Sequence, residues 1–150
     1  MVNLKVAGVD DRDLTALDTL VRLVSRATAV PIDTRYPAFG DDAFRTGTGV
    51  HASAIIKALE KGDKDLADRV YSGVPAGVFG FRQRIEISPV SGLSNVKCWL
   101  EEHGYDPEDA VLSEALFSAA KVADRVLDQA ECERLIAAAR ARSVADATRH

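Results

Sequence analysis

The sequence of residues 91–122 is SGLSNVKCWLEEHGYDPEDAVLSEALFSAAKV, and it contains two helical patterns separated by a turn. The first helix is expected to follow Ser91 and Gly92 and to end at Gly104, a residue type that commonly terminates helices. Apolar residues recur in it at helical spacing, at Val96, Trp99 and Leu100. This segment therefore predicts a helix with one buried face.

The second helix of this stretch has a strong start signal. Asp106 can accept a backbone N–H, and Pro107 suits the first helical position. We expect this helix to run to about Leu127. Asp128 and Glu131 then have the spacing of a capping box, which predicts a last helix directly afterwards.

Three further helices are expected upstream, over residues 11–29, 50–61 and 66–71. The first is amphipathic, and either Asp10 or Asp11 can cap it. Residues 1–9 alternate and contain glycine, which predicts an extended lead-in. Proline and glycine punctuate residues 30–49, which predicts a structured loop.

Residues 82–88 give the clearest strand pattern, because Gln83, Ile85 and Ile87 alternate with polar residues. The partner strand remains open between residues 74–79, residues 4–9 and another subunit. The tail, residues 143–150, lacks an apolar stripe and is expected to be frayed. These elements predict a mainly helical α+β fold with one or two short strands. We expect a hinge-like helical subdomain over residues 1–79, followed by a compact strand-plus-helices subdomain over residues 80–150.

Bulk composition excludes several classes of protein. The chain has 150 residues, 47% hydrophobic and 28% charged, which is typical of a globular protein. A net charge of −4 disfavours nucleic-acid binding. No apolar run is long enough for a membrane span or a signal peptide, so we expect a cytoplasmic location. Cys98 and Cys132 are far apart, which predicts packing or surface thiols rather than a zinc site or a disulfide.

Few side chains are candidates for chemistry. His103 lies at a predicted helix end, where it favours the negative end of the helix dipole, and His150 is terminal and expected to be solvated. His51 follows the glycine-rich residues 47–49 and falls in a predicted first helical turn, where anions bind. A capping or core histidine remains the alternative there. Tyr71 alone is more typical of a core aromatic residue.

Residues 47–57, GTGVHASAIIK, are followed by Tyr71, Pro75, Gly80 and Ile85, and then by the Ser91 and Gly92 pair. This arrangement resembles the region after the barrel in 2-isopropylmalate, homocitrate and citramalate synthases. The resemblance covers about residues 3–140. Such enzymes condense an acyl-CoA, usually acetyl-CoA, with a 2-oxo acid by Claisen chemistry on a metal-dependent (β/α)8 barrel. That implies amino-acid biosynthesis and a transferase activity.

The resemblance also implies roles for individual residues. His51 would serve proton transfer, and Tyr71 would position or polarise the reacting groups. Histidine suits the first role because it titrates near neutrality, and a tyrosine hydroxyl can donate to developing negative charge. We further expect Gly49 and Ser53, on either side of His51, to bind substrate. No metal ligand is expected in this chain, since the divalent metal belongs to the barrel.

A barrel of this kind takes about 250 residues, so 150 residues do not contain one. We therefore expect a small subunit of a naturally split synthase, inactive alone, that completes the active site of a separate barrel subunit in a hetero-oligomer. A non-catalytic regulatory or scaffold partner of a related synthase remains the alternative. A stand-alone helical binding domain is a third possibility. The identity of the 2-oxo acid is left open.

Overall fold

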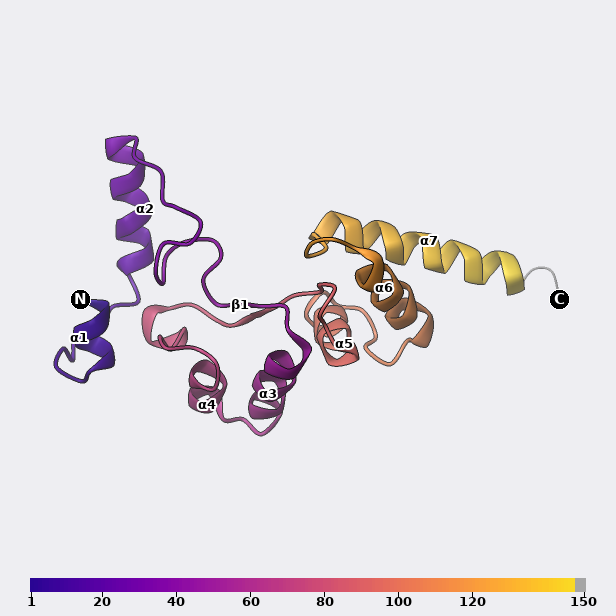
Figure 1. The fold of residues 1–150 in the computed structure, drawn as a ribbon, viewed down its shortest axis with the longest axis horizontal. Helices are drawn as coiled ribbons and strands as arrows, with labels where there is room; N and C mark the ends of the chain where they lie inside the picture. Colours follow the sequence, from indigo (N-terminus) through magenta and orange to yellow (C-terminus); the bar gives the residue numbers. More distant parts are fainter. Residues whose placement is uncertain (148–150) are drawn as a thin grey trace. The chain divides into compact units, whose positions relative to one another are not determined.

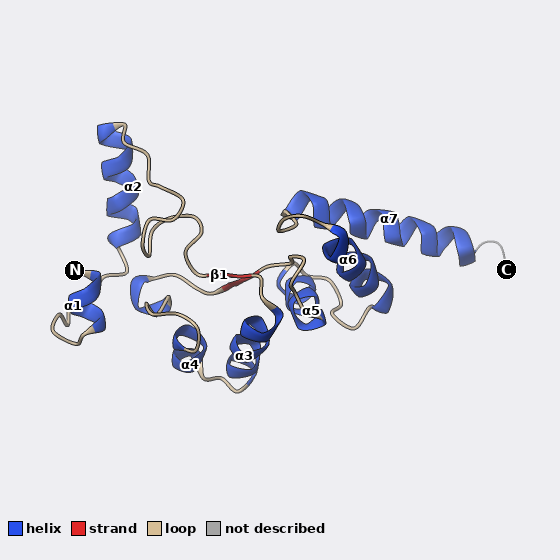
Figure 2. Ribbon diagram, viewed as in Figure 1, coloured by secondary structure: helices blue, strands red, loops and turns tan. Residues whose placement is uncertain are grey.

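The computed structural model describes residues 1–147, with side chains described to residue 144, and is mainly helical (Figures 1 and 2). This confirms the predicted α+β, mainly helical class. The elements in chain order are α1 (Val2–Val6), α2 (Leu17–Thr28), β1 (Arg45–Thr46), α3 (Gly49–Glu60), α4 (Lys64–Arg69), the 3-10 turn η1 (Gly77–Phe79), β2 (Arg84–Ile85), α5 (Leu93–Glu102), α6 (Ala110–Val122) and α7 (Gln129–Ala147).

The contacts divide the chain into two compact units, each discontinuous in sequence. Unit 1 comprises residues 1–45 and 57–84, and unit 2 comprises residues 46–56 and everything from residue 85 onward. The start of α3 therefore belongs to unit 2 and its last turn to unit 1. The division into subdomains at residue 79 stays a prediction. Among the described residues, no helix is both long and apolar enough to cross a membrane.

Unit 2 has a core formed by its three long helices. In this unit α6 contacts both α5 and α7 (Figure 1). The cluster centres on Val96, Trp99 and Leu100 of α5, Leu112, Leu116 and Ala120 of α6, and Cys132, Ile136 and Ala139 of α7. The buried positions recur every three or four residues, so each helix buries one face, as predicted for α5. Within α7, burial raises the pKa of the Cys132 thiol to about 12, which makes this cysteine a packing residue.

The helices α5 and α6 of unit 2 test the predicted boundaries. The boundaries of α5 are confirmed, and Gly104 follows it with a φ of 77°. The predicted start of α6 is wrong: Oδ1 of Asp109 accepts the N–H groups of Val111 (2.9 Å) and Leu112 (3.1 Å). Asp106 instead accepts the N–H of Glu108 (2.9 Å) in the preceding turn. The helix also ends at Val122 rather than near residue 127.

The predicted capping box of α7 is confirmed. Asp128 Oδ1 accepts the Glu131 N–H (2.8 Å), and Glu131 Oε2 accepts the Asp128 N–H (2.9 Å). These two bonds satisfy backbone groups that the first helical turn leaves unpaired. The expected fraying from residue 143 is wrong as far as Ala147, where α7 ends. His150 lies outside the described residues.

The capping box gives a pH prediction. Hydrogen bonds from the Arg125 guanidinium (2.7 Å) and the Asp128 N–H lower the pKa of Glu131 from 4.5 to about 2. A carboxylate with a lowered pKa stabilises the fold fully above its unfolded pKa and loses that effect as the pH falls. In urea unfolding, we expect wild type to exceed Glu131→Gln in stability above about pH 4.5 and this difference to shrink towards pH 2. A difference that stays constant over this range would contradict the charged cap.

In unit 1, two expectations about the start of the chain are wrong. Residues 2–6 form α1 rather than an extended lead-in, with the Lys5 N–H bonded to Met1 O (3.0 Å). The next helix, α2, begins only at Leu17 because turns hold the preceding residues. Asp10 binds the backbone and guanidinium of Arg12, and Asp13 accepts the Thr15 N–H (2.9 Å). Such local side-chain bonds compete with helix formation.

The strand of residues 82–88 is shorter than predicted, and its partner is none of the expected segments. Within residues 1–147, the sheet consists of β1 and β2. The Arg84 N–H binds Phe44 O (2.8 Å) and the Glu86 N–H binds Thr46 O (3.0 Å), which is a parallel register. β1 lies at the end of the loop of residues 30–49, whose irregular structure is otherwise as predicted. The ladder leads directly to α3.

Candidate functional site

His51 lies in the first turn of α3, where its side chain is exposed. The sequence predicted this position, and the helix begins two residues before the histidine, at Gly49. Behind it, Ala52, Ile55 and Ala58 form the buried face of α3. The helix therefore packs through these apolar side chains, while the side chain of His51 is exposed.

The chain enters α3 through Gly47, whose carbonyl is tightly held. This carbonyl accepts hydrogen bonds from the hydroxyls of Ser91 (2.7 Å) and Ser88 (2.9 Å), and a longer one from Asn95 Nδ2 (3.4 Å). All three side chains are buried. Because buried hydrogen-bonded networks resist displacement, they fix the backbone from which His51 projects.

Asn95 is the organising residue of this network, and the sequence analysis missed it. Its side chain is 0% exposed. Nδ2 donates to Glu86 O (3.0 Å), and Oδ1 accepts the Gly92 N–H (3.1 Å) at the start of α5. The hydroxyl of Ser91 also reaches Glu86 O (3.1 Å), but it has only one proton to share with Gly47 O. The available sequence signal was an asparagine three residues after the N-cap glycine of a helix.

Gly49 is required by packing inside unit 2. A Cβ at this position would lie 2.6 Å from Gly92 N, and the Gly49 N–H donates to Val90 O (3.1 Å). Glycine therefore lets the start of α3 approach the segment before α5. A substrate-binding role for Gly49 stays a prediction.

We expect Gly49→Ala to destabilise the protein by about 1–3 kcal/mol, as overpacking a tight contact does. The added methyl group meets backbone, which has little freedom to move. Urea unfolding measures the loss. The matched control is Gly73→Ala, because a Cβ at Gly73 would meet no atom within 4 Å. Equal stability of the two variants would contradict the close approach.

Ser53 is half-buried and lies one turn after Gly49 on the same side of α3. His51 is two residues from each, and residues two apart on a helix do not face each other. The helix therefore does not bring His51 together with Ser53. Binding of substrate by Ser53 stays a prediction.

Tyr71 belongs to unit 1, whereas His51, Gly49 and Ser53 belong to unit 2. It follows α4 and is 50% exposed. Next to it, the Ser72 hydroxyl donates to Val74 O (2.6 Å), which closes a turn before the buried residues Pro75 and Ala76. Tyr71 is thus presented from an ordered turn rather than packed in a core. Its joint action with His51 stays a prediction.

Comparisons with known proteins identify relatives of this region. The chain is 30% identical over 104 residues to a homocitrate synthase of Pyrococcus horikoshii, a match of 69% of the chain and 26% of that enzyme. It is 33% identical over 109 residues to a putative (R)-citramalate synthase of Methanosphaerula palustris, matching 72% of the chain and 20% of the relative. A probable 2-isopropylmalate synthase of Archaeoglobus fulgidus is 27% identical over 104 residues. No protein-family model matches the chain.

The chain matches the carboxy-terminal region of this synthase family. It spans about a quarter of the homocitrate synthase and about a fifth of the citramalate and 2-isopropylmalate synthases. The predicted resemblance is therefore confirmed for the region that carries His51 and Tyr71 as candidates. The activities named for these relatives belong to the longer proteins.

Two other features of this synthase-like chain bear on the site. His103 stacks on Trp99 with ring centroids 3.8 Å apart, and its Nδ1 lies 2.7 Å from Trp99 O at the end of α5. This contact gives His103 a structural role in unit 2. Among the described residues, the His, Cys, Asp and Glu side chains form no group of three that could hold a metal ion.

Proposed function

We propose that this chain is the accessory region of an acyl-CoA/2-oxo acid condensing synthase, and that it acts as a small subunit with a separate barrel subunit. In this proposal His51 and Tyr71 enter the barrel of the partner, which holds the divalent metal and binds the acyl-CoA. A cytoplasmic location is part of the proposal. The similarity to three kinds of Claisen-type synthase over about 70% of the chain supports the choice of reaction class.

The observation that carries the proposal is the presentation of His51. It is an exposed histidine on the first turn of a helix whose approach is fixed by buried hydrogen bonds. Condensation requires removal of a proton from the α-carbon of the thioester and protonation of the alkoxide that forms. Imidazole is the side chain that suits proton transfer of this kind, and here it projects from a backbone that buried side chains hold in place.

Exposed apolar side chains give the proposal a second support. The helix α2 has no buried residue, and Leu20, Leu23 and Val24 on its apolar face are each about half exposed. Such surface commonly marks a protein interface. We propose that the barrel subunit covers it.

Mixing purified proteins tests the proposal. A barrel-only member of the family is assayed with acetyl-CoA and a panel of 2-oxo acids, by release of free CoA, with and without this chain. We expect the chain to raise turnover and to co-elute with the barrel protein in gel filtration. Co-elution without a change in turnover would favour a regulatory or scaffold partner. The proposal would be excluded if barrel proteins encoded beside the chain showed neither a rise in turnover nor co-elution with it.

A further inference from the structure

Unit 1 contains a hollow of about 390 Å³ that the proposed synthase function does not use. Pockets of a few hundred cubic ångströms are the size that holds small molecules. Among the residues that line it are three arginines, one carboxylate and two aromatic rings: Arg22, Arg82, Arg84, Asp41, Phe44 and Phe81. The lining therefore combines positively charged and aromatic side chains.

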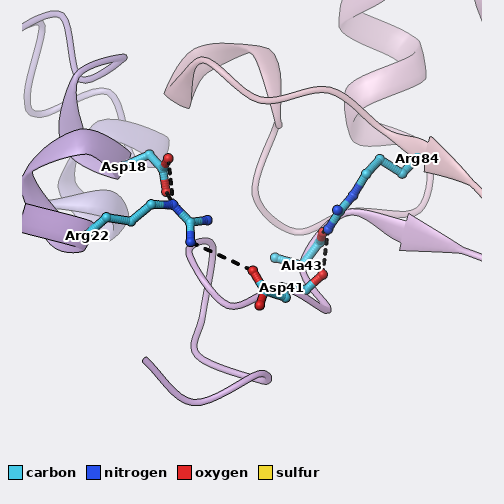
Figure 3. A network of polar contacts seen from close by, with 5 residues as sticks. All are labelled: Asp18, Arg22, Asp41, Ala43 and Arg84. Atoms are coloured by element: carbon cyan, nitrogen blue, oxygen red, sulfur yellow. Dashed lines mark hydrogen bonds and ion pairs between the residues drawn. The ribbon is translucent and has the colours of Figure 1, made fainter. Parts of the chain in front are cut away.

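One of the three arginines is neutralised within the chain. Arg22 of α2 donates through Nε to both oxygens of Asp18 (2.9 and 3.0 Å). Its guanidinium also lies 3.8 Å from Asp41 Oδ1. Figure 3 shows Arg22 between these two carboxylates. Arg22 thus shapes the hollow but contributes little uncompensated charge to it.

The other two arginines, Arg82 and Arg84, form no ion pair with a described carboxylate. Arg84 donates to the backbone carbonyls of Asp41 and Ala43 (3.2 Å to Ala43), as Figure 3 shows, and a carbonyl does not neutralise a guanidinium. Arg82 forms no hydrogen bond or ion pair with any residue that the structure describes. In an extended chain, residues two apart project to the same side. Two unneutralised guanidiniums therefore line one hollow.

The apolar side of the hollow is ordered. The rings of Phe44 and Phe81 are in contact, with centroids 5.3 Å apart, and Phe81 also meets Phe39 edge-on at 5.8 Å. Phe44 holds a φ of 61°, which is rare for a residue other than glycine. Its side chain lines the same hollow as the three arginines. An anion alone would need only the arginines, whereas the rings suit an apolar or flat ligand part.

We propose that this hollow binds a small organic anion with two negative charges, carboxylate or phosphate, whose apolar part lies against Phe44 and Phe81. Planar guanidinium groups match both kinds of acid through paired hydrogen bonds. The proposal requires neither the barrel subunit nor the chemistry of His51.

Calorimetric titration of the full chain tests the site with four probes: inorganic phosphate, phenyl phosphate, succinate and phenylsuccinate. We expect each aromatic probe to bind more tightly than its plain counterpart, and the comparison of the two pairs distinguishes phosphate from carboxylate ligands. Arg82→Gln should weaken binding by about tenfold or more, the usual cost of a lost charged hydrogen bond. Arg69→Gln is the matched control, since Arg69 is an exposed arginine of the same unit, paired with Asp65.

A second variant is expected to gain affinity, which a misfolded protein would not do. Asp41 is the carboxylate of the lining, and its side chain is 77% exposed. Asp41→Asn removes a negative charge that repels the ligand, so we expect binding to tighten several-fold, with a weaker effect at high salt. No binding of any probe at millimolar concentration would overturn the site. Equal binding by wild type, Arg82→Gln and Asp41→Asn would also overturn it.

Discussion

Replacing His51 by alanine is expected to lower the turnover of barrel plus chain by about 10²–10⁴-fold, the usual contribution of a general acid–base group. The side chain is exposed at the start of α3, so its removal leaves the buried face of that helix intact. We therefore expect the free energy of unfolding to change by less than about 1 kcal/mol. The measurement is steady-state release of CoA by the mixture, beside urea unfolding of the variant alone.

His103→Ala is the control for loss of an imidazole elsewhere in unit 2. It removes the ring stacked on Trp99, so it should lower stability while leaving the turnover of the mixture unchanged. Turnover that is equally insensitive to both variants would remove His51 from the chemistry. If His51→Ala lowers both turnover and binding to the barrel protein, His51 has a role in the interface instead. Co-elution with the barrel protein is therefore measured for both variants.

Sequence predicted best where the signals were local. The boundaries of α5 and the capping box of α7 depend on residues within one helical turn, Gly104 at the end of one helix and Asp128 with Glu131 at the start of the other. The position of His51 in a first turn was likewise set by neighbouring glycines. In these segments, local geometry and tertiary packing favour the same structure.

The errors arose where two local choices compete or where the partner is distant. Asp106 and Asp109 both suit a helix cap, and only the structure shows that Asp109 bonds the first turn of α6. The parallel partner of β2 lies 40 residues earlier, at the Phe44 carbonyl that Arg84 meets. Asn95 went unnoticed for the same reason, because its bond to the Gly47 carbonyl joins residues 48 apart. Pairing over such separations leaves no periodic mark in a single sequence.

Asn95→Ala is expected to lower the free energy of unfolding by about 2–4 kcal/mol, because unpaired buried polar groups each cost about 1–3 kcal/mol. The Gly92 N–H loses Asn95 Oδ1 as its acceptor, and the carbonyls of Glu86 and Gly47 lose Asn95 Nδ2 as a donor. Urea unfolding at pH 7 measures the loss. We also expect this variant to lower the turnover of the barrel protein mixed with the chain, because the Gly47 carbonyl before His51 loses one of its hydrogen bonds.

The variant Asn95→Asp tests the donor role of Nδ2 separately from the acceptor role of Oδ1. One carboxylate oxygen can still accept the Gly92 N–H, but the other would face the carbonyl oxygens of Glu86 and Gly47, which Nδ2 now approaches at 3.0 and 3.4 Å. Only a protonated acid can donate there, so burial and repulsion raise the pKa of this aspartate in the folded protein. A raised pKa stabilises the fold at low pH and loses that effect as the pH rises. We therefore expect the stability deficit of Asn95→Asp to grow from pH 4 to pH 7, while that of Asn95→Ala stays constant. Deficits that run parallel across this range would show that Nδ2 does not donate to these carbonyls.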